Sequence, residues 1–436
     1  MRQGTVEYTR ENGLCCGCGV CKGICPQSCI SWVRENGLYV PQINKNHCIN
    51  CGICLSVCPG FTHKYEQAET VEKAVTGTVL LCCNAWSKDV LMRHVGASGG
   101  VVMTMIEELL SAGCYDGVFC LDSYDYKDIL KTRLYIPEDI RNNLHRSNSP
   151  KSRYLPVSHE NALEYMKNHR EMRLIIVGTS CAIRGLQSAA KVLNLKREQY
   201  LFVGLFCDQV FNYNVVSFFQ DTYANGKTIR QLHFKNKESG GWPGDMKVFP
   251  EAGDPFYISK AERMKAKPWF VPERCLYCVD KLNVCADISL GDNYTEKDSS
   301  SLGSNSVIIR TESGMEAWRA VSHRLVAREV DVQDIQKAQY LQGRLNNLHY
   351  ANLKRLQLSD VTNLNDGMAE QVDSREFIAV WKAKRKQLEA GGAYDRNPIK
   401  LRLLMLGNSV KGSLVVRFVR SSARKFINHI LRMAEV

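Results

Sequence analysis

The sequence predicts an α/β protein in three parts: a cysteine-rich N-terminal α+β module, a domain built on a largely parallel sheet, and a helical C-terminal region. Ten of the 19 cysteines precede residue 59. Two continuous apolar runs, 174–177 and 200–206, flank a helical pattern, which is typical of a buried strand–helix–strand unit. Residues 377–389 indicate a further helix, closed by two glycines.

A chain of 436 residues is too long for one small core, so several domains are expected. We expect a cysteine module at 1–60, a linker at 61–78, an α/β domain at 79–325, a helical region at 326–392 and a basic amphipathic tail at 393–436. The polar start of the chain and the lack of a bilayer-length apolar run predict neither a signal peptide nor a membrane span. Cluster thiolates need a reducing compartment, so we expect a cytoplasmic protein.

Two copies of one cysteine pattern organise the N-terminal module. Each copy reads C-x2-C-x2-C-x3-C-P, the spacing of bacterial ferredoxins that hold two 4Fe–4S clusters. In that arrangement three closely spaced cysteines bind one cluster, and the fourth binds the other. We therefore predict one cluster at Cys15, Cys18, Cys21 and Cys58, and a second at Cys48, Cys51, Cys54 and Cys25. Zinc sites use separated cysteine pairs, and the spacing does not suit disulfides.

The segment between the two copies, residues 30–43, alternates apolar and polar residues around Asn36 and Gly37. This pattern predicts a β-hairpin with a tight turn. Cys16 and Cys29 lie inside the module but outside the ligand register. We expect these two cysteines to be packing residues, because a free cysteine behaves as a small hydrophobe.

A glycine-rich turn precedes a buried helical pattern at 101–110 in the second domain. The turn consists of Gly96, Ala97, Ser98, Gly99 and Gly100. Such a turn leaves backbone N–H groups free at the positive end of the helix, where they attract a phosphate or another anion. A plain glycine turn explains the same residues equally well.

A third group of cysteines is predicted at one edge of the sheet. Cys181 and Cys207 each follow the carboxyl end of a strand in the strand–helix–strand unit, and open α/β sheets bind ligands at that edge. A later C-x2-C supplies Cys275 and Cys278. One hypothesis is that these four thiols bind a third 4Fe–4S cluster. The alternatives are a redox-active C-x2-C, a zinc site, or a cluster in which Cys285 replaces one ligand.

Five further segments complete the α/β domain. Strands are predicted at 117–121, 286–292 and 306–310, and a helix at 313–326 places Trp318 on its apolar side. The polar stretch 147–156 contains Lys151, Arg153 and Tyr154, and a solvated loop is its ordinary structure.

The net charge of +12 overstates how basic the protein is, because each cluster with its thiolates carries a charge of about −2. We therefore expect no nucleic-acid partner. Residues 396–436 hold nine Lys or Arg and one acid, with apolar faces between them. This tail either lies on an anionic membrane, docks a partner, or packs on its own domain.

The full set of motifs resembles the coenzyme F420 hydrogenase/dehydrogenase beta-subunit family, which also includes 7-hydroxymethyl chlorophyll a reductase. The resemblance covers roughly residues 1–320. It rests on the cysteine module, GASGG at 96–100, GTSC at 178–181, LFC at 205–207 and CLYCVDKLNVCADISLGD at 275–292. The usual G-T-P-C-Q is Gly178-Thr179-Ser180-Cys181-Ala182 here, the usual His-Gly is Asp208-Gln209, and the usual aromatic pair after Gly-Asp is Asn293-Tyr294.

The resemblance implies FAD and a third 4Fe–4S cluster in the α/β domain, with the glycine turn in the flavin region. It makes Lys151, Arg153 and Tyr154 candidates for flavin or substrate contacts and assigns no catalytic residue. It also implies an oxidoreductase that joins one-electron clusters to a two-electron hydride carrier, with ferredoxin or another electron-transfer protein as partner and a small organic molecule or deazaflavin as substrate. The alternatives are an electron-transfer beta subunit without independent activity and a cluster-based sensor.

Overall fold

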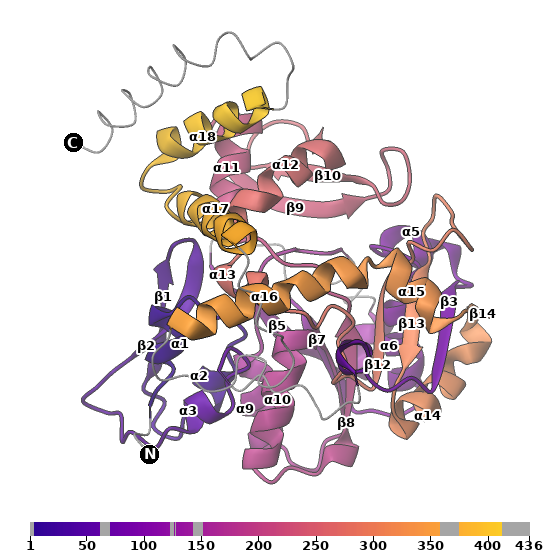
Figure 1. Ribbon diagram of the computed structural model, residues 1–436. Coiled ribbons are helices and arrows are strands. Elements are labelled where there is room, and N and C mark those ends of the chain that lie inside the picture. The colour runs from indigo at the N-terminus through magenta and orange to yellow at the C-terminus, as the bar shows by residue number, and fades with distance from the viewer. Residues whose placement is uncertain are drawn as a thin grey trace.

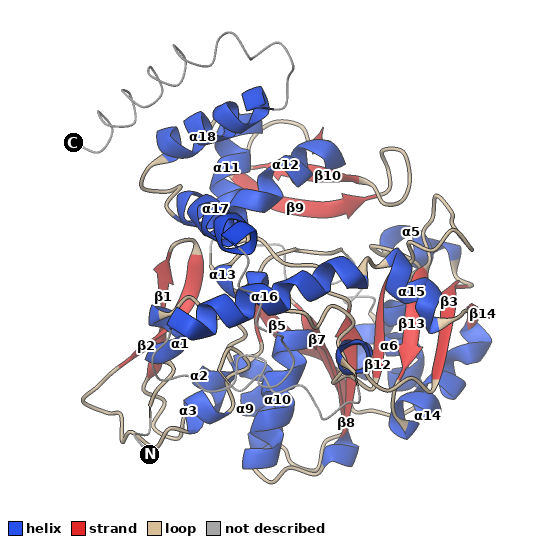
Figure 2. Ribbon diagram, in the orientation of Figure 1, coloured by secondary structure: helices blue, strands red, loops and turns tan. Residues whose placement is uncertain are grey.

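The computed structural model describes residues 4–61, 70–122, 126, 128–142, 151–357 and 375–411. Figure 1 shows the N-terminal module beside a large central sheet, with a smaller lobe above them. Strands and helices alternate through the central domain (Figure 2). The predicted α/β class, with its ferredoxin-like module, is confirmed.

The N-terminal module repeats one local design. A glycine with positive φ, Gly19 or Gly52, precedes each of two short helices. These helices are α2 (Val20–Ile24) and α3 (Ile53–Ser56), and α1 (Glu7–Glu11) precedes them. The predicted hairpin is confirmed: β1 (Ile30–Glu35) pairs antiparallel with β2 (Leu38–Ile43), and the two turn residues have φ of 49° and 74°.

The central sheet has the strand order β14-β3-β13-β12-β8-β7-β4-β5-β6 among the described residues. Its strands are β3 (Leu81–Ser87), β4 (Gly117–Leu121), β5 (Leu130–Tyr135), β6 (Val157–Ser158), β7 (Leu174–Thr179), β8 (Tyr200–Leu205), β12 (Ile288–Asp292), β13 (Asn305–Ile309) and β14 (Leu325–Glu329).

The middle of this sheet is parallel and most of its outer pairings are antiparallel. Strands β12, β8, β7 and β4 run parallel, as the strand–helix–strand pattern predicts. On one side β13, β3 and β14 are antiparallel to their neighbours, as is β5 beside β4 on the other side. The sheet is thus mixed rather than largely parallel. Residues 293–304 return the chain from β12 to β13 without a crossover helix, and such a connection gives antiparallel strands.

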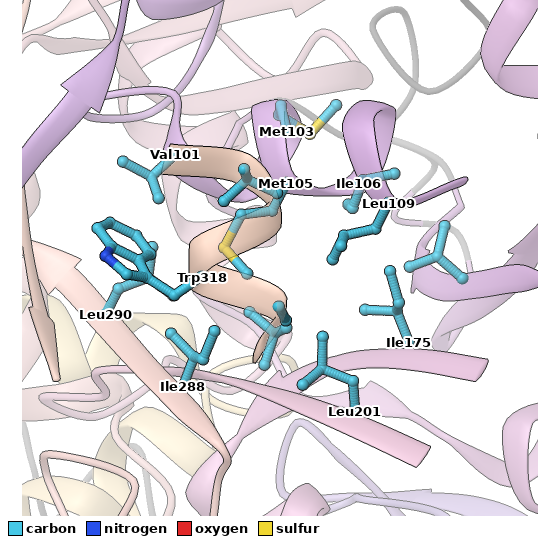
Figure 3. Close-up of a cluster of buried hydrophobic side chains, with 14 of the residues drawn as sticks. Val101, Met103, Met105, Ile106, Leu109, Ile175, Leu201, Ile288, Leu290 and Trp318 are labelled. Carbon is cyan, nitrogen blue, oxygen red and sulfur yellow. The ribbon is translucent and has the colours of Figure 1, made fainter. Parts of the chain in front are cut away.

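Alternate residues of the central strands face two cores. Ile175 and Leu201 face a core covered by α6 (Val101–Ser111) and α14 (Glu312–Val321), which includes Trp318 (Figure 3). Ile176 and Phe202 face the opposite core, under α9 (Glu160–Asn168) and α10 (Ser180–Val192). The predicted helix at 313–326 ends at Val321, because the chain turns into the edge strand β14.

The N-terminal module is packed into that second core. Val20 and Val57 of the module belong to the same buried cluster as the α9 and α10 side chains. A Cβ atom added at Gly23 would lie 3.0 Å from the carbonyl oxygen of Glu160, so α2 and α9 approach closely. Trp32 Nε1 donates a hydrogen bond to Glu160 Oε2 at 2.8 Å. The module is therefore held rigidly against the central domain.

The upper lobe was not predicted as a unit from the sequence, but the helix predicted at 377–389 is confirmed as one of its elements. It contains a three-stranded antiparallel sheet and four helices around a separate core. These elements are β9 (Ile229–Asn236), β10 (Asp245–Pro250), β11 (Phe256–Ile258), α11 (Asn214–Tyr223), α12 (Lys260–Phe270), α17 (Arg375–Gly392) and α18 (Pro398–Lys411). The long helix α16 (Leu341–Gln357) crosses the molecule between this lobe and the central sheet (Figure 1).

The remaining helices are short. They are α4 (Val71–Thr76), α5 (Val90–Val95), α7 (Pro137–Arg141), α13 (Glu273–Leu276) and α15 (Val332–Ala338). Within the described residues, no helix is both long and apolar enough to cross a membrane. Residues 62–69 of the predicted linker and 412–436 of the predicted basic tail lie outside the described residues.

Candidate metal centres and cofactor cavity

The outer group of cysteines surrounds a small cavity at the surface of the module. Cys25, Cys48, Cys51 and Cys54 line this cavity, of about 20 Å³, together with Cys29. Cys29 Sγ lies 3.5 Å from Cys25 Sγ. Ile49, beside the cavity, is 61% exposed. The structure therefore brings together the four predicted ligands of one cluster close to solvent, with a fifth thiol beside them.

The inner group lies deeper, toward the central domain. Burial raises the pKa of Cys21, and the next largest effects on that thiol come from Cys58 and Cys15. Burial and Cys58 likewise raise the pKa of Cys15 to about 12. Cys18 also feels the fields of Cys58 and Cys21. The fourth cysteine of the second repeat thus lies with the first three of the first repeat, as the crossed ligand pattern requires.

The third group assembles at the predicted edge of the central sheet. Cys181 lies in the first turn of α10, Cys207 follows β8, and the C-x2-C places Cys275 in α13 and Cys278 just after it. All four thiols line one cavity of about 580 Å³. Burial, followed by the field of Cys278, raises the pKa of Cys275 to about 11. Cys285 does not line this cavity.

Cys16 connects the inner and third groups. Its thiol lies within hydrogen-bonding reach of both Cys18 and Cys181, and it lines the large cavity beside them. The contact with Cys16 is the largest influence on Cys181, and together with burial it raises the pKa of that thiol. The sequence predicted only a packing role for Cys16, because its position beside another segment depends on tertiary structure.

Three cations surround the carboxylate of Asp208, the residue after Cys207. Asp208 lies 2.5 Å from Lys267, 3.2 Å from Lys281 and 3.8 Å from Arg344. Desolvation opposes ionisation of Asp208, but these three cations outweigh it and lower its pKa to about 2. The backbone N–H of Cys207 donates to the carbonyl of Lys281 at 2.9 Å.

The residues fit iron–sulfur clusters better than a single ion. Each group supplies four thiols, the ligand set of a 4Fe–4S cluster. Throughout the described ranges, no three His, Cys, Asp or Glu side chains converge closely enough to hold one metal ion. The runs of three cysteines in the module also differ from the separated cysteine pairs of zinc sites.

The large cavity also contains the predicted glycine turn. Gly96, Ala97, Ser98 and Gly100 line it, with Val101 at the start of α6. Gly99 packs behind the turn, where an added Cβ would lie 2.8 Å from the carbonyl oxygen of Ala85. Gly100 has a φ of 79°, which glycine adopts most readily. A volume of about 580 Å³ lies in the usual range for small-molecule and cofactor sites.

The three candidate contact residues of the loop also line this cavity. Burial lowers the pKa of Lys151 to about 8, because desolvation disfavours its charged form. Arg153 is 2% exposed. Tyr154 has a φ of 52°, and its ring packs edge-on against Phe234. The described part of the loop, residues 151–156, is therefore part of the cavity wall and not the solvated loop of the ordinary interpretation.

Two further anchors of the cavity were missed from the sequence. Asp292, at the end of β12, forms an ion pair with Lys235 and accepts hydrogen bonds from Trp242 Nε1 at 3.2 Å and from the Tyr294 hydroxyl at 3.1 Å. Lys237 Nζ donates to the carbonyl of Ser98 at 2.6 Å and so holds the glycine turn. The Gly-Asp at a strand end was visible in the sequence, but its lysine partner lies in the unpredicted β9.

The fold and these sites define a ferredoxin-type module joined to an α/β domain with a cysteine-lined ligand cavity. Comparison with known proteins identifies the class. Residues 82–164 and 171–360 match the N-terminal and C-terminal parts of the coenzyme F420 hydrogenase/dehydrogenase beta subunit, and residues 41–60 match the 4Fe–4S binding domain. The chain belongs to this beta-subunit family, which is a family of oxidoreductases, and it carries a 4Fe–4S binding domain.

Two individual proteins resemble the chain. An uncharacterized protein of Nostoc sp. (strain PCC 7120) is 25% identical over 243 residues, which are 53% of this chain and 54% of that protein. The chain thus spans about half the length of this curated relative. A chain of the F420-reducing [NiFe] hydrogenase complex from Methanosarcina barkeri shares the fold, with a TM-score of 0.50 and 20% identity over 68% of this chain and 98% of that chain.

Proposed function

We propose that the protein is an iron–sulfur flavoprotein oxidoreductase. It passes single electrons through three 4Fe–4S clusters to or from FAD, and the FAD exchanges a hydride with a small organic substrate or a deazaflavin. The observation that carries the proposal is the order of the cysteine groups. The outer group lies near solvent, the inner group contacts the third through Cys16, and the third lines the same cavity as the glycine turn.

The two cofactors have complementary chemistry. Iron–sulfur clusters supply one-electron transfer, and a flavin supplies exchange between one-electron and two-electron carriers. The chain would contribute wiring and positioning. Gly100 and Val101 would present backbone N–H groups and the positive end of α6 to the FAD pyrophosphate. Lys151 and Arg153 would place positive charge beside flavin or substrate phosphates and carboxylates.

The outer group is the proposed point of exchange with a protein partner. It lies beside the exposed Ile49, and Cys48 and Cys51 are partly accessible. A small redox protein such as ferredoxin is the proposed partner, because it can bring its own cluster close to this surface without a conformational change. A membrane contact through the basic tail stays a prediction, since most of that tail lies outside the described residues.

The second candidate function is an electron-transfer beta subunit that works only within a larger hydrogenase or dehydrogenase. The family description and the hydrogenase complex that contains the structural neighbour favour it. Turnover measurements with reduced ferredoxin as the sole protein partner separate the two candidates. Substrate reduction by the isolated chain supports the oxidoreductase, and loaded but inactive protein supports the subunit.

Anaerobic purification followed by iron, sulfide and flavin analysis tests the proposal itself. We expect about twelve irons per chain, since each cluster holds about four, and one FAD. A chain with about eight irons and no flavin would be a ferredoxin module joined to a domain of another function, and the proposal would fail.

A further inference from the structure

Helix α16 lies against the third cysteine group. Arg344 and Asn347 lie about one turn apart on this helix, and both side chains are buried. The Asn347 side-chain amide donates to the carbonyl of Cys278 at 2.7 Å and to that of Cys275 at 3.4 Å. One side chain of α16 therefore holds the backbone of the C-x2-C loop.

The helix is also anchored C-terminal to this contact. Tyr350 and Ala351 share a core with Leu14 of the N-terminal module and Tyr277 of the C-x2-C loop. Further along, Lys354 Nζ lies 3.1 Å from Glu273 Oε1. The helix thus packs on the segment before the first cysteine repeat and on the third group together, which fixes its register over the thiols.

Arg344 faces the thiols themselves. Its side chain is 7% exposed and lines the large cavity. Nη1 is 3.4 Å from the carbonyl oxygen of Asp208, but the buried Nε has no hydrogen-bond partner among the described residues. Burial opposes the charge of Arg344, and the fields of Cys278, Asp208, Cys207 and Cys275 outweigh burial and raise its pKa. A buried guanidinium with an unmatched N–H is suited to an anionic group in this space.

The charged side chains near the third cysteine group have a net charge opposite to that of a 4Fe–4S cluster with its thiolates. Lys267, Lys281 and Arg344 carry three positive charges and Asp208 one negative charge, so the set has a net charge of +2. An oxidised 4Fe–4S cluster with four thiolates carries about −2. Lys281 also donates to the carbonyl of Gln339, and Lys267 lies in the upper lobe. Among these three cations, Arg344 is the one whose pKa is raised by the fields of three of the four third-group thiols.

We propose that Arg344 is a positioning residue whose guanidinium stabilises the reduced form of the third cluster and so raises its reduction potential. The inference rests on the proposed function. Reduction adds one electron and makes the cluster more negative, so a fixed cation beside the sulfurs favours the reduced state. The thiols that act on Arg344 all belong to the third group. The inner group has a different buried cation, because Arg274 of α13 acts on Cys58.

Redox titration of anaerobic protein, followed by electron paramagnetic resonance, tests this role. Arg344→Gln should move the midpoint of the third cluster to lower potential and leave the two module clusters unchanged. Arg344→Lys, which keeps the charge, should restore most of the wild-type value. Lys354→Gln is the matched control: it removes one charge from the same helix at similar burial, 6% exposed, while Glu273 keeps Arg385 at 3.1 Å. This variant should not shift the third cluster.

Iron content decides how each outcome is interpreted. Loss of about four irons in Arg344→Gln, restored in Arg344→Lys, supports the same stabilisation by charge. Loss in all three variants indicates a packing effect of α16 and contradicts the inference. An unchanged midpoint in fully loaded Arg344→Gln also overturns it and leaves the proposed function intact. Wild-type protein with about eight irons would contradict both the role of Arg344 and the proposed function.

Discussion

The N-terminal module and the third cysteine group bring their thiols together by different means. In the module, eight cysteines come from two local repeats within 44 residues, Cys15 to Cys58, and each repeat places its own helix after a glycine. In the third group, four cysteines come from three segments spread over residues 181–278. The parallel strands β7 and β8 bring the first two together, and α16 holds the loop that carries the others.

This comparison shows two ways to assemble a metal centre: local sequence spacing in the module, and tertiary packing in the third group. Sequence spacing alone orients the module ligands, so damage elsewhere should leave them assembled. The third group depends on strand order and on one distant helix, so it should respond to changes far from its ligands. The cavity beside it shares this dependence, because β9, β12 and α6 all contribute to its wall.

The largest expected effects test the crossed ligand pattern in the module. Cys58→Ser should remove the same paramagnetic signal as Cys21→Ser, and Cys25→Ser the same signal as Cys54→Ser, with loss of about four irons in each case. The reason is that Cys58 lies with the first repeat. If Cys58→Ser instead lost the signal that Cys54→Ser loses, the two clusters would be uncrossed.

The next effect concerns how the module is joined to the domain. The Glu160 carboxylate is 3% exposed and lies 3.2 Å from Lys22 and 3.0 Å from Lys131. Glu160→Gln leaves two partly exposed cations beside a neutral amide and should cost about 1 to 2 kcal/mol in the free energy of unfolding, because water screens both cations. Denaturant titration under anaerobic conditions measures this cost. Glu312→Gln, which breaks the exposed pair with Arg319, should change stability by less than about 1 kcal/mol. Equal effects would mean that Glu160 does not bind the two parts.

Lys151 gives the cavity a pH dependence. Its pKa is about 8 in the folded protein and 10.5 without burial, so between these values the unfolded chain binds more protons. Flavin-free wild-type protein should therefore gain about 2 kcal/mol relative to Lys151→Met as pH rises from about 8 to 10.5. Denaturant titrations of both proteins across this range measure the difference. A constant difference would show that Lys151 is solvated.

The smallest effect compares two glycines of positive φ. Gly100 lies in the cavity turn, where an added Cβ would be 3.0 Å from the Met92 carbonyl oxygen, whereas Gly113 ends the same helix with nothing within 4 Å. Both alanine variants should lose about 1 kcal/mol of stability for the backbone conformation. Gly100→Ala alone should also reduce bound FAD. Equal flavin content in the two variants would show that the glycine turn is not part of the cofactor site.

The sequence predicted those features that depend on local spacing or on strand order. The cysteine repeats, the hairpin turn at Asn36-Gly37 and the meeting of Cys181 with Cys207 needed only spacing, turn chemistry and the rule that parallel strands end at one edge. GASGG was recognised as a turn before a helix. Its place in the same cavity as the third group became clear only in the folded chain.

The missed features depend on contacts between distant segments. Strands β9 and β10 form a separate small sheet in a stretch without marked alternation, so neither strand was predicted. Arg344 and Asn347 lie on a helix that was predicted only as part of a mixed helical region. Their register over Cys275 and Cys278 is fixed by packing against Leu14 and Tyr277, which no local pattern shows.

We propose that the third cysteine group holds a cluster of its own beside the flavin cavity. Iron analysis of anaerobically prepared wild-type and Cys278→Ser proteins tests it most directly. We expect about twelve irons per chain in the wild type and about eight in the variant, with both module signals retained. Equal iron content in the two proteins would contradict it.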